Sequence, residues 1–436
     1  MTRPRAVIVV TGSELVRGER TDLNGPFLAR ETLSLGFEPA RIVIVGDAEA
    51  ELEDALREGL EAELCVISGG LGPTHDDRTV AVLARVAGRA LVFDEELHGQ
   101  IEAVARGHAE RMRRPYDDFV PGVRKQATRP DGSVAIGMAG TAPALVVEHE
   151  GGAVVVLPGP PAELQSLWPR ALGTEPLRRL LARARPPGRR ALRFFGVNES
   201  AVGRALEDAG GEGYGVDATI CARDFEVHVD LVVEPGAEDR ADGLADALAG
   251  QLRRYLFARD DSPVEELVLK LCRTRGFTLA AAESCTGGLV ATRLTAVPGA
   301  SDCFVGGIVA YADETKRALL GVPGEVLERH GAVSAETAAA MARGARERLG
   351  ADVAVSVTGV AGPGGGSEEK PVGLVHLHAS GPDGERDAEL RFPGDRETIR
   401  RRAAVTALHL VRRLLARAAG DEGALAVSAQ NRHRRV

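Results

Sequence analysis

Apolar and polar residues alternate along the first 170 positions in the order expected of a sheet covered by helices. Short runs rich in valine and isoleucine, such as RAVIVV and RIVIVGD, are separated by amphipathic stretches such as TDLNGPFLARETLSLGF. β-branched runs of this length are typical of buried strands, and the longer stretches have the period of helices. The pattern predicts an α/β domain with a mostly parallel sheet over residues 1–170.

Prolines and charges interrupt the pattern at ARARPPGRR (182–190), which predicts a domain boundary. We therefore expect a small α+β domain over residues 171–258, in which DATICARDFEVHVDLVVE reads as one strand. A further α/β domain is expected over residues 259–420. The polar segment 421–436, which ends NRHRRV, is expected to be a disordered tail.

Composition excludes several classes of partner. Aromatic residues make up only 4% of the 436 positions, and the formal net charge is −9. Neither value favours a nucleic-acid surface, and no apolar run is long enough to span a membrane. The five cysteines form no CxxC pair, which favours a reducing, cytoplasmic compartment without a zinc site (Cys65, Cys221, Cys272, Cys285, Cys303).

Lysine is unusually scarce. Of 54 basic residues only four are lysines, at positions 125, 270, 316 and 370, which leaves 54 − 4 = 50 arginines. Lysine can act as a neutral base when its environment favours the neutral amine, whereas arginine cannot. Lys316 is therefore a better candidate for chemistry than an average lysine, although an exposed helix lysine is the simpler alternative.

Three glycine-punctuated stretches in the last domain carry the candidate chemistry. They are AAAESCTGG (280–288), GGIVAYADETKRALLGV (306–322) and VSVTGVAGPGGGSEEKPVG (355–373). We expect Ser284 at a strand-to-helix turn, where helix N–H groups can stabilise an oxyanion, and Lys316 in the first turn of a helix. A serine with a lysine base is a known nucleophile for amide cleavage. The alternatives are that Ser284 or Thr286 only caps a helix, or that Cys285 is the nucleophile.

A second candidate site lies in the loop GGLGPTHDDRT (69–79) of the first domain. Its glycines allow main-chain amides to approach a phosphate, and Asp76 and Asp77 suit a hard divalent cation. Asp47 follows a neighbouring strand. The alternative is a tight turn that caps the next helix.

The C-terminal motifs ESCTGG, Tyr311 to Lys316, TGVAGPGGGSEEKPVG and FPGDR closely resemble the C-terminal domain of the CinA family. The resemblance implies an amidohydrolase that converts nicotinamide mononucleotide to nicotinate mononucleotide and ammonia without a cofactor. Ser284 would then be the nucleophile, Lys316 its base, and Tyr311 and Thr358 their support. Implied substrate-binding residues are Glu283, Thr286, Gly287, Ser301, Gly359, Gly362 and Arg396.

The stretches TGSELVRGERTDLN, GGLGPTHDDRT and LPGPPAELQSLW resemble the N-terminal CinA domain, which is similar to molybdopterin-binding domains. This implies a three-layer domain with ADP-ribose pyrophosphatase activity that uses Mg²⁺, Mn²⁺ or Co²⁺, with K⁺ as a further candidate. The implied nucleotide-site residues are Glu14, Asn24, Asp47, Gly69, Gly70, Gly72, Thr74 and Lys125, and the implied metal ligands are Asp76 and Asp77. The stretch IGMAGTAPAL departs from the family pattern at Gly137 and Ala144.

The middle domain resembles the KH-like domain of CinA proteins but lacks the GXXG loop of KH domains that bind nucleic acid. We expect a homodimer that does not bind nucleic acid directly. Two alternatives stay open. The N-terminal site could only bind a pterin or nucleotide, or the protein could be a non-catalytic adaptor in competence or recombination.

Overall fold

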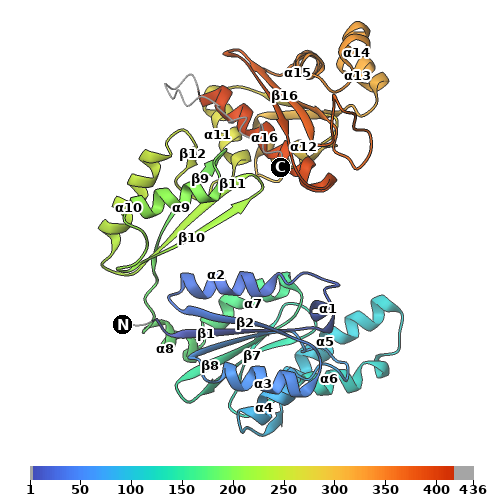
Figure 1. The fold of residues 1–436 in the computed structure, drawn as a ribbon. Coiled ribbons are helices and arrows are strands. Elements are labelled where there is room, and N and C mark those ends of the chain that lie inside the picture. Colours follow the sequence, from blue (N-terminus) through green and yellow to red (C-terminus); the bar gives the residue numbers. More distant parts are fainter. Residues whose placement is uncertain (1–2, 417–436) are drawn as a thin grey trace. The chain divides into compact units, whose positions relative to one another are not determined.

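The computed structural model describes residues 3–416 and divides into two compact units, with the boundary between Pro187 and Gly188 (Figure 1). The boundary predicted at residue 170 was wrong, because it falls inside helix α7 (Pro161–Leu172). Helix α8 (Glu175–Leu181) follows it and buries Leu177 and Leu180 in the core of the first unit. The proline-rich segment found in the sequence marks the true boundary.

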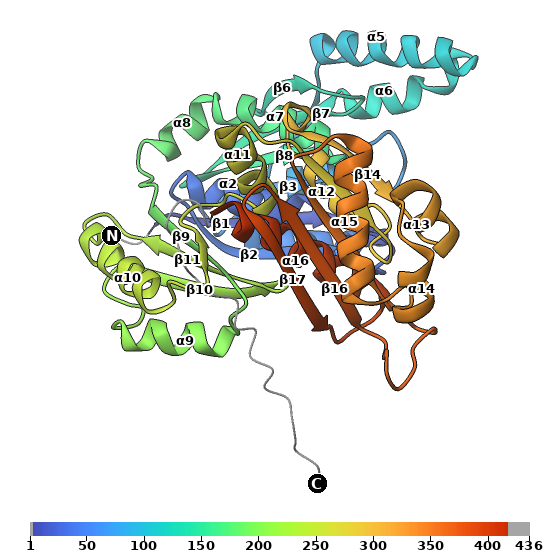
Figure 2. The same cartoon turned by 90° about the horizontal axis from the view of Figure 1, so that it is seen from above.

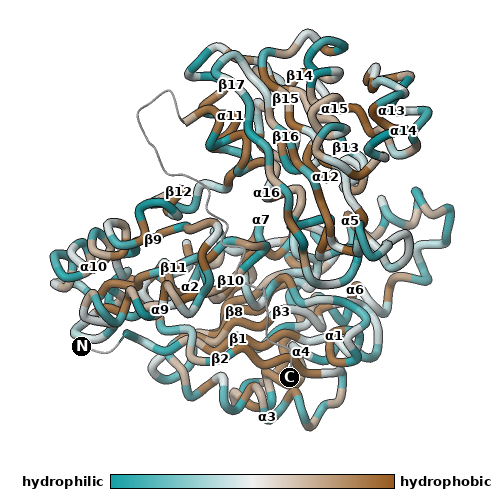
Figure 3. Tube along the Cα trace, turned by 45° about the horizontal axis from the view of Figure 1, so that its top comes forward, coloured by the Kyte–Doolittle hydropathy of each residue, from teal (hydrophilic) through white to brown (hydrophobic). Residues whose placement is uncertain are grey.

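The first unit is built on a six-stranded sheet of order β2-β1-β3-β8-β7-β6. Its first four strands are parallel, β7 runs antiparallel to them, and β6 runs antiparallel to β7. Figure 3 shows hydrophobic residues concentrated along the central strands, as expected of a sheet buried on both faces. The strands are β1 (Arg5–Thr11), β2 (Glu38–Val45), β3 (Leu64–Ser68), β6 (Val134–Met138), β7 (Pro143–His149) and β8 (Gly152–Leu157).

Two apolar cores cover the two faces of this sheet. Helices α2 (Asn24–Ser34), α7 and α8 contribute to one core, and α3 (Glu49–Gly59) and α4 (Thr79–Val86) to the other. The expected three-layer domain is therefore confirmed. The remaining elements are α1 (Ser13–Val16), β4 (Leu91–Phe93), α5 (Glu95–Met112), η1 (Tyr116–Asp118), α6 (Val120–Gln126) and β5 (Thr128–Pro130).

The second unit begins with the expected α+β domain, a four-stranded antiparallel sheet of order β10-β11-β9-β12. The single strand predicted over DATICARDFEVHVDLVVE is a hairpin that turns at Asp224 and Phe225. The elements are β9 (Gly188–Phe195), α9 (Glu199–Asp208), β10 (Val216–Arg223), β11 (Glu226–Val233), α10 (Glu238–Gln251) and β12 (Leu256–Ala258).

The last domain has a five-stranded sheet of order β14-β13-β15-β16-β17, in which β14, β13 and β15 are parallel. Figure 2 shows α13 and α14 packed beside α15 at one margin of this domain. The strands are β13 (Leu279–Glu283), β14 (Phe304–Val309), β15 (Val353–Gly359), β16 (Leu374–Gly381) and β17 (Gly384–Arg391). The helices are α11 (Val264–Arg275), α12 (Leu289–Thr295), η2 (Ala300–Asp302), α13 (Asp313–Leu320), α14 (Gly324–His330), α15 (Ala335–Leu349) and α16 (Arg396–Ala416).

Among residues 3–416, no helix is both long enough and apolar enough to cross a bilayer. The expected disordered tail at 421–436 lies outside the described residues.

Candidate active sites at two sheet edges

The three glycine-punctuated stretches of the last domain meet at the carboxyl edge of its parallel strands. The main-chain N–H of Ser284 donates to the Val357 carbonyl at 2.9 Å, and the Ala310 N–H donates to the Glu283 carbonyl at 2.8 Å. Ser284 therefore lies beside the end of β14 on one side and beside Thr358 on the other. This is the edge where ligands bind in open α/β sheets.

Glu283 has a role that the sequence did not predict. It is buried, and its carboxylate accepts the main-chain N–H groups of Gly288 (3.0 Å), Val290 (3.0 Å) and Ala291 (2.9 Å) at the start of α12. The helix cap is therefore Glu283, and neither Ser284 nor Thr286 has that function. These N–H groups are occupied, so they cannot supply the oxyanion site expected from the helix terminus.

This arrangement leaves the Ser284 hydroxyl available. The Ser284 residue is 8% exposed, and its hydroxyl makes no hydrogen bond within the described part of the chain. The hydroxyl of the neighbouring Thr286 is buried and also lacks a partner. Gly287 follows with a φ of +59°, a left-handed conformation that side chains disfavour, so the turn after the serine depends on glycine.

Arg400 is the residue that the sequence analysis missed in this site. From the second turn of α16 its guanidinium donates to the Cys285 carbonyl at 3.1 Å and to the Thr286 carbonyl at 2.8 Å. Arginine is so frequent in this chain that no sequence signal distinguished Arg400 from its neighbours. Its contacts hold the serine loop against the last helix.

Cys285 is a poor alternative nucleophile. The residue is almost fully buried, and burial raises the pKa of its thiol to about 12. Because the thiolate is the reactive form of cysteine, such a thiol is inert near neutral pH.

Lys316 is 1% exposed, so the alternative of an ordinary surface lysine is wrong. It lies in the first turn of α13, as predicted, and its Nζ donates to the Tyr311 carbonyl at 3.0 Å. The Asp313 carboxylate is 3.5 Å from the same nitrogen. Among the described residues no hydrogen bond joins Lys316 to Ser284, although both residues lie at the same edge of the sheet.

Arg396 connects two of the predicted stretches. Its guanidinium donates to the Tyr311 hydroxyl at 2.7 Å and to the Gly362 carbonyl at 2.6 Å. Gly362 has a φ of +80°, which again requires glycine. The Tyr311 side chain is exposed, so its ring is available to a ligand at the edge of the site.

Two other predicted residues make contacts within the fold, and a third lies away from Ser284. The Thr358 hydroxyl donates to the Ala332 carbonyl at 2.6 Å. A side chain at Gly359 would lie 2.6 Å from the Leu374 carbonyl, so this glycine permits strand packing. Ser301 lies in η2 before β14 begins, at the amino edge of the sheet, and this chain does not bring it to Ser284.

The predicted residues of the first unit also gather at a carboxyl edge. Glu14 and Asn24 line a cavity of about 460 Å³ with Arg20 and Asp22. The Asn24 amide nitrogen donates to Ser68 Oγ (2.9 Å) and to the Gly159 carbonyl (2.7 Å), whereas its buried oxygen has no partner. Asn24 Oδ1 can therefore accept a hydrogen bond from a ligand hydroxyl.

The glycine loop forms the neighbouring part of this edge. Gly70 has a φ of +68°, and a side chain there would collide with Thr79. Asp77 accepts the Thr74 N–H at 3.0 Å, and Lys125 donates to the Thr74 carbonyl. Partial burial lowers the pKa of Lys125. A second cavity, of about 190 Å³, is lined by Gly70, Gly72, Asp77 and Lys125.

The acidic residues do not form a preformed metal site. Over residues 3–416, no three histidine, cysteine, aspartate or glutamate side chains are close enough together to hold an ion. The Asp77 carboxylate is bonded to Thr74, and the Asp47 carboxylate accepts the Ser13 hydroxyl. Asp76, Asp77 and Asp47 therefore do not make a metal cage.

Gly137 and Ala144, the two departures from the family pattern, face each other across β6 and β7.

Gly69 lies at the same sheet edge and has a φ of +106°. A Cβ atom there would lie 2.5 Å from the Thr11 hydroxyl, so this position requires glycine.

These features define a multidomain α/β protein with a molybdopterin-binding-like domain and a second, C-terminal α/β site. Residues 7–177 match the family described as "Probable molybdopterin binding domain", and residues 261–415 match the "CinA C-terminal domain". The chain is 44% identical over 420 residues to a "CinA-like protein" of Mycobacterium sp. (strain JLS), covering 94% of this chain and 99% of the relative. The chain belongs to the CinA family.

A second curated relative agrees with this assignment. A "CinA-like protein" of Mycobacterium tuberculosis (strain ATCC 25618 / H37Rv) is 43% identical over 421 residues, covering 94% of this chain and 97% of the relative. Among solved structures, competence/damage inducible protein CihA from Agrobacterium tumefaciens is 43% identical and covers 36% of this chain and 99% of its own, with a TM-score of 0.34. A MogA structure is 18% identical and covers 40% of this chain and 99% of its own, with a TM-score of 0.28.

Proposed function

We propose that the C-terminal site hydrolyses the carboxamide of nicotinamide mononucleotide to nicotinate mononucleotide and ammonia. The observation that carries the proposal is the Ser284 hydroxyl, which has no hydrogen-bond partner among residues 3–416 and lies at the sheet edge that also carries the buried Lys316. The resemblance of the surrounding motifs to the CinA C-terminal domain supports the choice of this substrate.

The proposed reaction proceeds through an acyl-enzyme. Ser284 Oγ attacks the carboxamide carbon while its proton passes to Lys316, and the intermediate releases ammonia when that proton is returned to the leaving nitrogen. Water then attacks the ester, and Ser284 is regenerated together with the nicotinate carboxylate. For the first proton transfer, Lys316 Nζ must turn from the Tyr311 carbonyl toward Ser284, a rearrangement that substrate binding would have to drive.

Two arginines have separate roles in the proposed reaction: one can bind the phosphate of the substrate, and the other positions the serine loop. Arg396 lies at the sheet edge beside the exposed Tyr311 ring, where a guanidinium can bind a phosphate. Arg400 holds the serine loop in place through the Cys285 and Thr286 carbonyls. No cofactor is needed for this chemistry.

Ammonia release from nicotinamide mononucleotide by the purified full chain tests the proposal. Ser284→Ala should abolish release, whereas Cys285→Ser should retain most of it. Retention of the full rate by Ser284→Ala would eliminate the serine mechanism. No release by the unaltered chain would eliminate the substrate.

For the first unit we propose a second activity, hydrolysis of the pyrophosphate of ADP-ribose or a related nucleotide. Two cavities of this unit support it. One offers the Asn24 oxygen, which has no partner among the described residues, to a hydroxyl, and the other offers Lys125 and the glycine loop to a phosphate. Since the residues form no metal cage, Mg²⁺, Mn²⁺, Co²⁺ and K⁺ are to be added singly to the assay. Loss of cleavage in Asp77→Ala, with amidase activity retained, would support this site. Undiminished cleavage would place the activity elsewhere.

A cytoplasmic location and a homodimer complete the proposal. Sedimentation of the full chain measures the second of these directly.

A further inference from the structure

One helix contacts both the C-terminal site and the middle domain. The first two turns of α16 carry Arg396 and Arg400, which hold the Tyr311, Gly362 and serine-loop segments. Nine residues after Arg400, the same helix carries His409, whose Nε2 donates to a carboxylate oxygen of Glu226 at 2.7 Å. Glu226 is the first residue of β11 in the middle domain.

The His409 contact is buried and directional. His409 is 0% exposed, its ring stacks on Phe195 at 3.8 Å, and its Nδ1 accepts from Arg412 at 3.3 Å. Burial lowers the pKa of His409 to about 3, so the imidazole is neutral and carries its proton on Nε2, as both hydrogen bonds require. A neutral imidazole in this tautomer has only one orientation that satisfies both partners.

Glu226 is held from its second oxygen as well. His228 donates to that oxygen at 3.0 Å. Burial alone would raise the pKa of the Glu226 carboxyl, but the hydrogen bonds from His228 and His409 outweigh it and lower the pKa to about 2. The carboxylate therefore stays ionised and fixed between β11 and α16.

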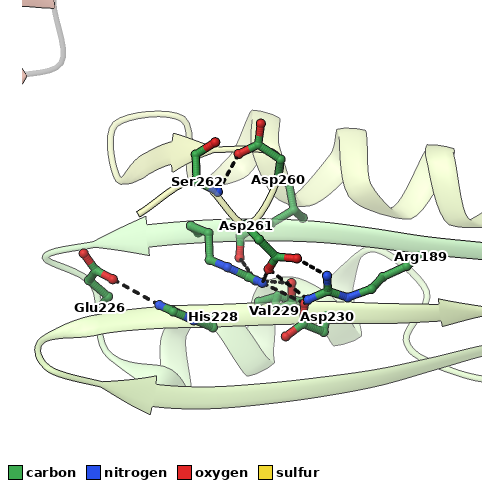
Figure 4. Close-up of polar contacts among 10 residues, drawn as sticks. Arg189, Glu226, His228, Val229, Asp230, Asp260, Asp261 and Ser262 are labelled. Atoms are coloured by element: carbon green, nitrogen blue, oxygen red, sulfur yellow. Dashed lines mark hydrogen bonds and ion pairs between the residues drawn. The ribbon is translucent and has the colours of Figure 1, made fainter. Parts of the chain in front are cut away.

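A network of ion pairs fixes the strand that carries Glu226 to the start of the last domain (Figure 4). Arg193 is almost fully buried and donates to Asp230 of β11 at 2.9 Å and to Asp261 in the connecting segment. Arg189 donates to Asp261 at 2.9 Å. The middle sheet therefore has a defined position relative to the chain that enters α11, and β11 is not free to follow a displaced α16.

We infer that Glu226 and His409 are positioning residues for the proposed amidohydrolase site, and that the middle domain sets the position of α16 through them. An α-helix rises about 1.5 Å per residue, so His409 lies roughly 13 Å along the axis from Arg400. A helix of this length moves as one rigid body, and a shift at His409 is therefore transmitted to Arg396 and Arg400. These two arginines would in turn move the serine loop and Tyr311.

Apolar packing alone does not determine the position of α16 along its axis. Its inner face consists largely of alanine, leucine and valine, such as Ala404, Leu408 and Val411, and packed helices of this kind can slide by small amounts in shear motions. A buried polar pair with a single hydrogen-bonded geometry excludes such alternatives, which is the best-attested use of buried polar groups. The pair accordingly contributes register more than stability.

The experiment compares Glu226→Ala, Glu226→Gln and a matched control in the full chain. In Glu226→Gln the amide oxygen still accepts the His409 N–H, so this conservative variant should restore most of the activity lost in Glu226→Ala. The control is Arg259→Ala, which removes an exposed ion pair with Asp246 in the same domain (2.6 Å) but does not touch α16. We expect kcat/KM for nicotinamide mononucleotide to fall about tenfold in Glu226→Ala, because small displacements of catalytic groups have effects of this order or larger.

A second readout does not depend on activity. Amide hydrogen exchange at residues 285–288 should accelerate in Glu226→Ala, and less so in Glu226→Gln and Arg259→Ala. Unchanged exchange in this loop, with kcat and KM within twofold of the parent, would overturn the inference. If the parent chain itself releases no ammonia, the proposed reaction fails, but the exchange comparison still decides whether Glu226 positions the loop.

Discussion

Replacement of Glu283 by glutamine should loosen the serine loop and the start of α12. One carboxylate oxygen accepts the Gly288 and Val290 N–H groups, and the other accepts that of Ala291. Glutamine offers a single acceptor oxygen and no charge, so at least one N–H group loses its partner.

The size of the effect follows from the bonds that are lost. A hydrogen bond to a charged group contributes about 1.5–3 kcal/mol, and the interaction of a negative charge with a helix N-terminus adds about 0.3–1 kcal/mol. We therefore expect Glu283→Gln to lower the local stability of this segment by roughly 2–4 kcal/mol. Since about 1.4 kcal/mol corresponds to a factor of ten, exchange should accelerate at least about thirtyfold.

Amide hydrogen exchange on the full chain, followed at Gly288, Val290 and Ala291, measures this opening directly. Glu336→Gln is a suitable control. Glu336 also lies in the first turn of a helix, α15, but the side chain that caps this helix is that of Ser334. A change of less than about threefold at these three amides in Glu283→Gln would show that the carboxylate does not hold the turn, and the account of the free Ser284 hydroxyl would then fail.

Three other predictions concern the second unit. Lys316→Arg should be nearly as damaging to ammonia release as Lys316→Ala, because arginine keeps the charge but cannot act as a base; a well-retained rate in the arginine variant would exclude the base role. Cys285 should react with a thiol reagent only after denaturant is added, because burial raises its thiol pKa to about 12, and rapid labelling of the native chain would contradict this. Glu226 and His409 both have pKa values lowered by folding, to about 2 and about 3, so the folded state binds fewer protons than the unfolded state. Their contribution to stability is complete above the ordinary histidine pKa of 6.5 and is lost as pH falls toward 2; urea titrations between pH 7 and pH 4 should show this fall, and His409→Phe should reduce it.

Several parts of the fold were predictable because their signals are local. The valine-rich runs of the first unit became β1, β2, β3 and β8, and the glycine-rich stretches became loops at strand ends. The hairpin at Asp224 and Phe225 was missed because both residues have positive φ values, +48° and +76°, without a glycine to signal the turn. Phe225 is held there by an edge contact with Phe392 at 5.4 Å between ring centres, which lies far away in the sequence.

The candidate site shows the same division. Ser284 and Lys316 were predicted because a serine at the end of an apolar run, and a lysine in a chain with only four lysines, can be recognised in the sequence. The roles of Glu283, Arg400 and His409 could not be predicted from the sequence, because each depends on a partner that only the folded structure brings close. Composition even concealed Arg400, since one arginine among 50 carries little information.

The position of α16 in the chain has a consequence for the order in which the site forms. Arg400 is synthesised more than a hundred residues after the serine whose loop it holds, as its separation from Cys285 indicates (115 residues). A chain still emerging from the ribosome can complete β13 and its turn, but it lacks the helix that fixes them. Premature termination before residue 396 should therefore leave a partly folded domain, in which the candidate site stays incomplete because α16 is missing.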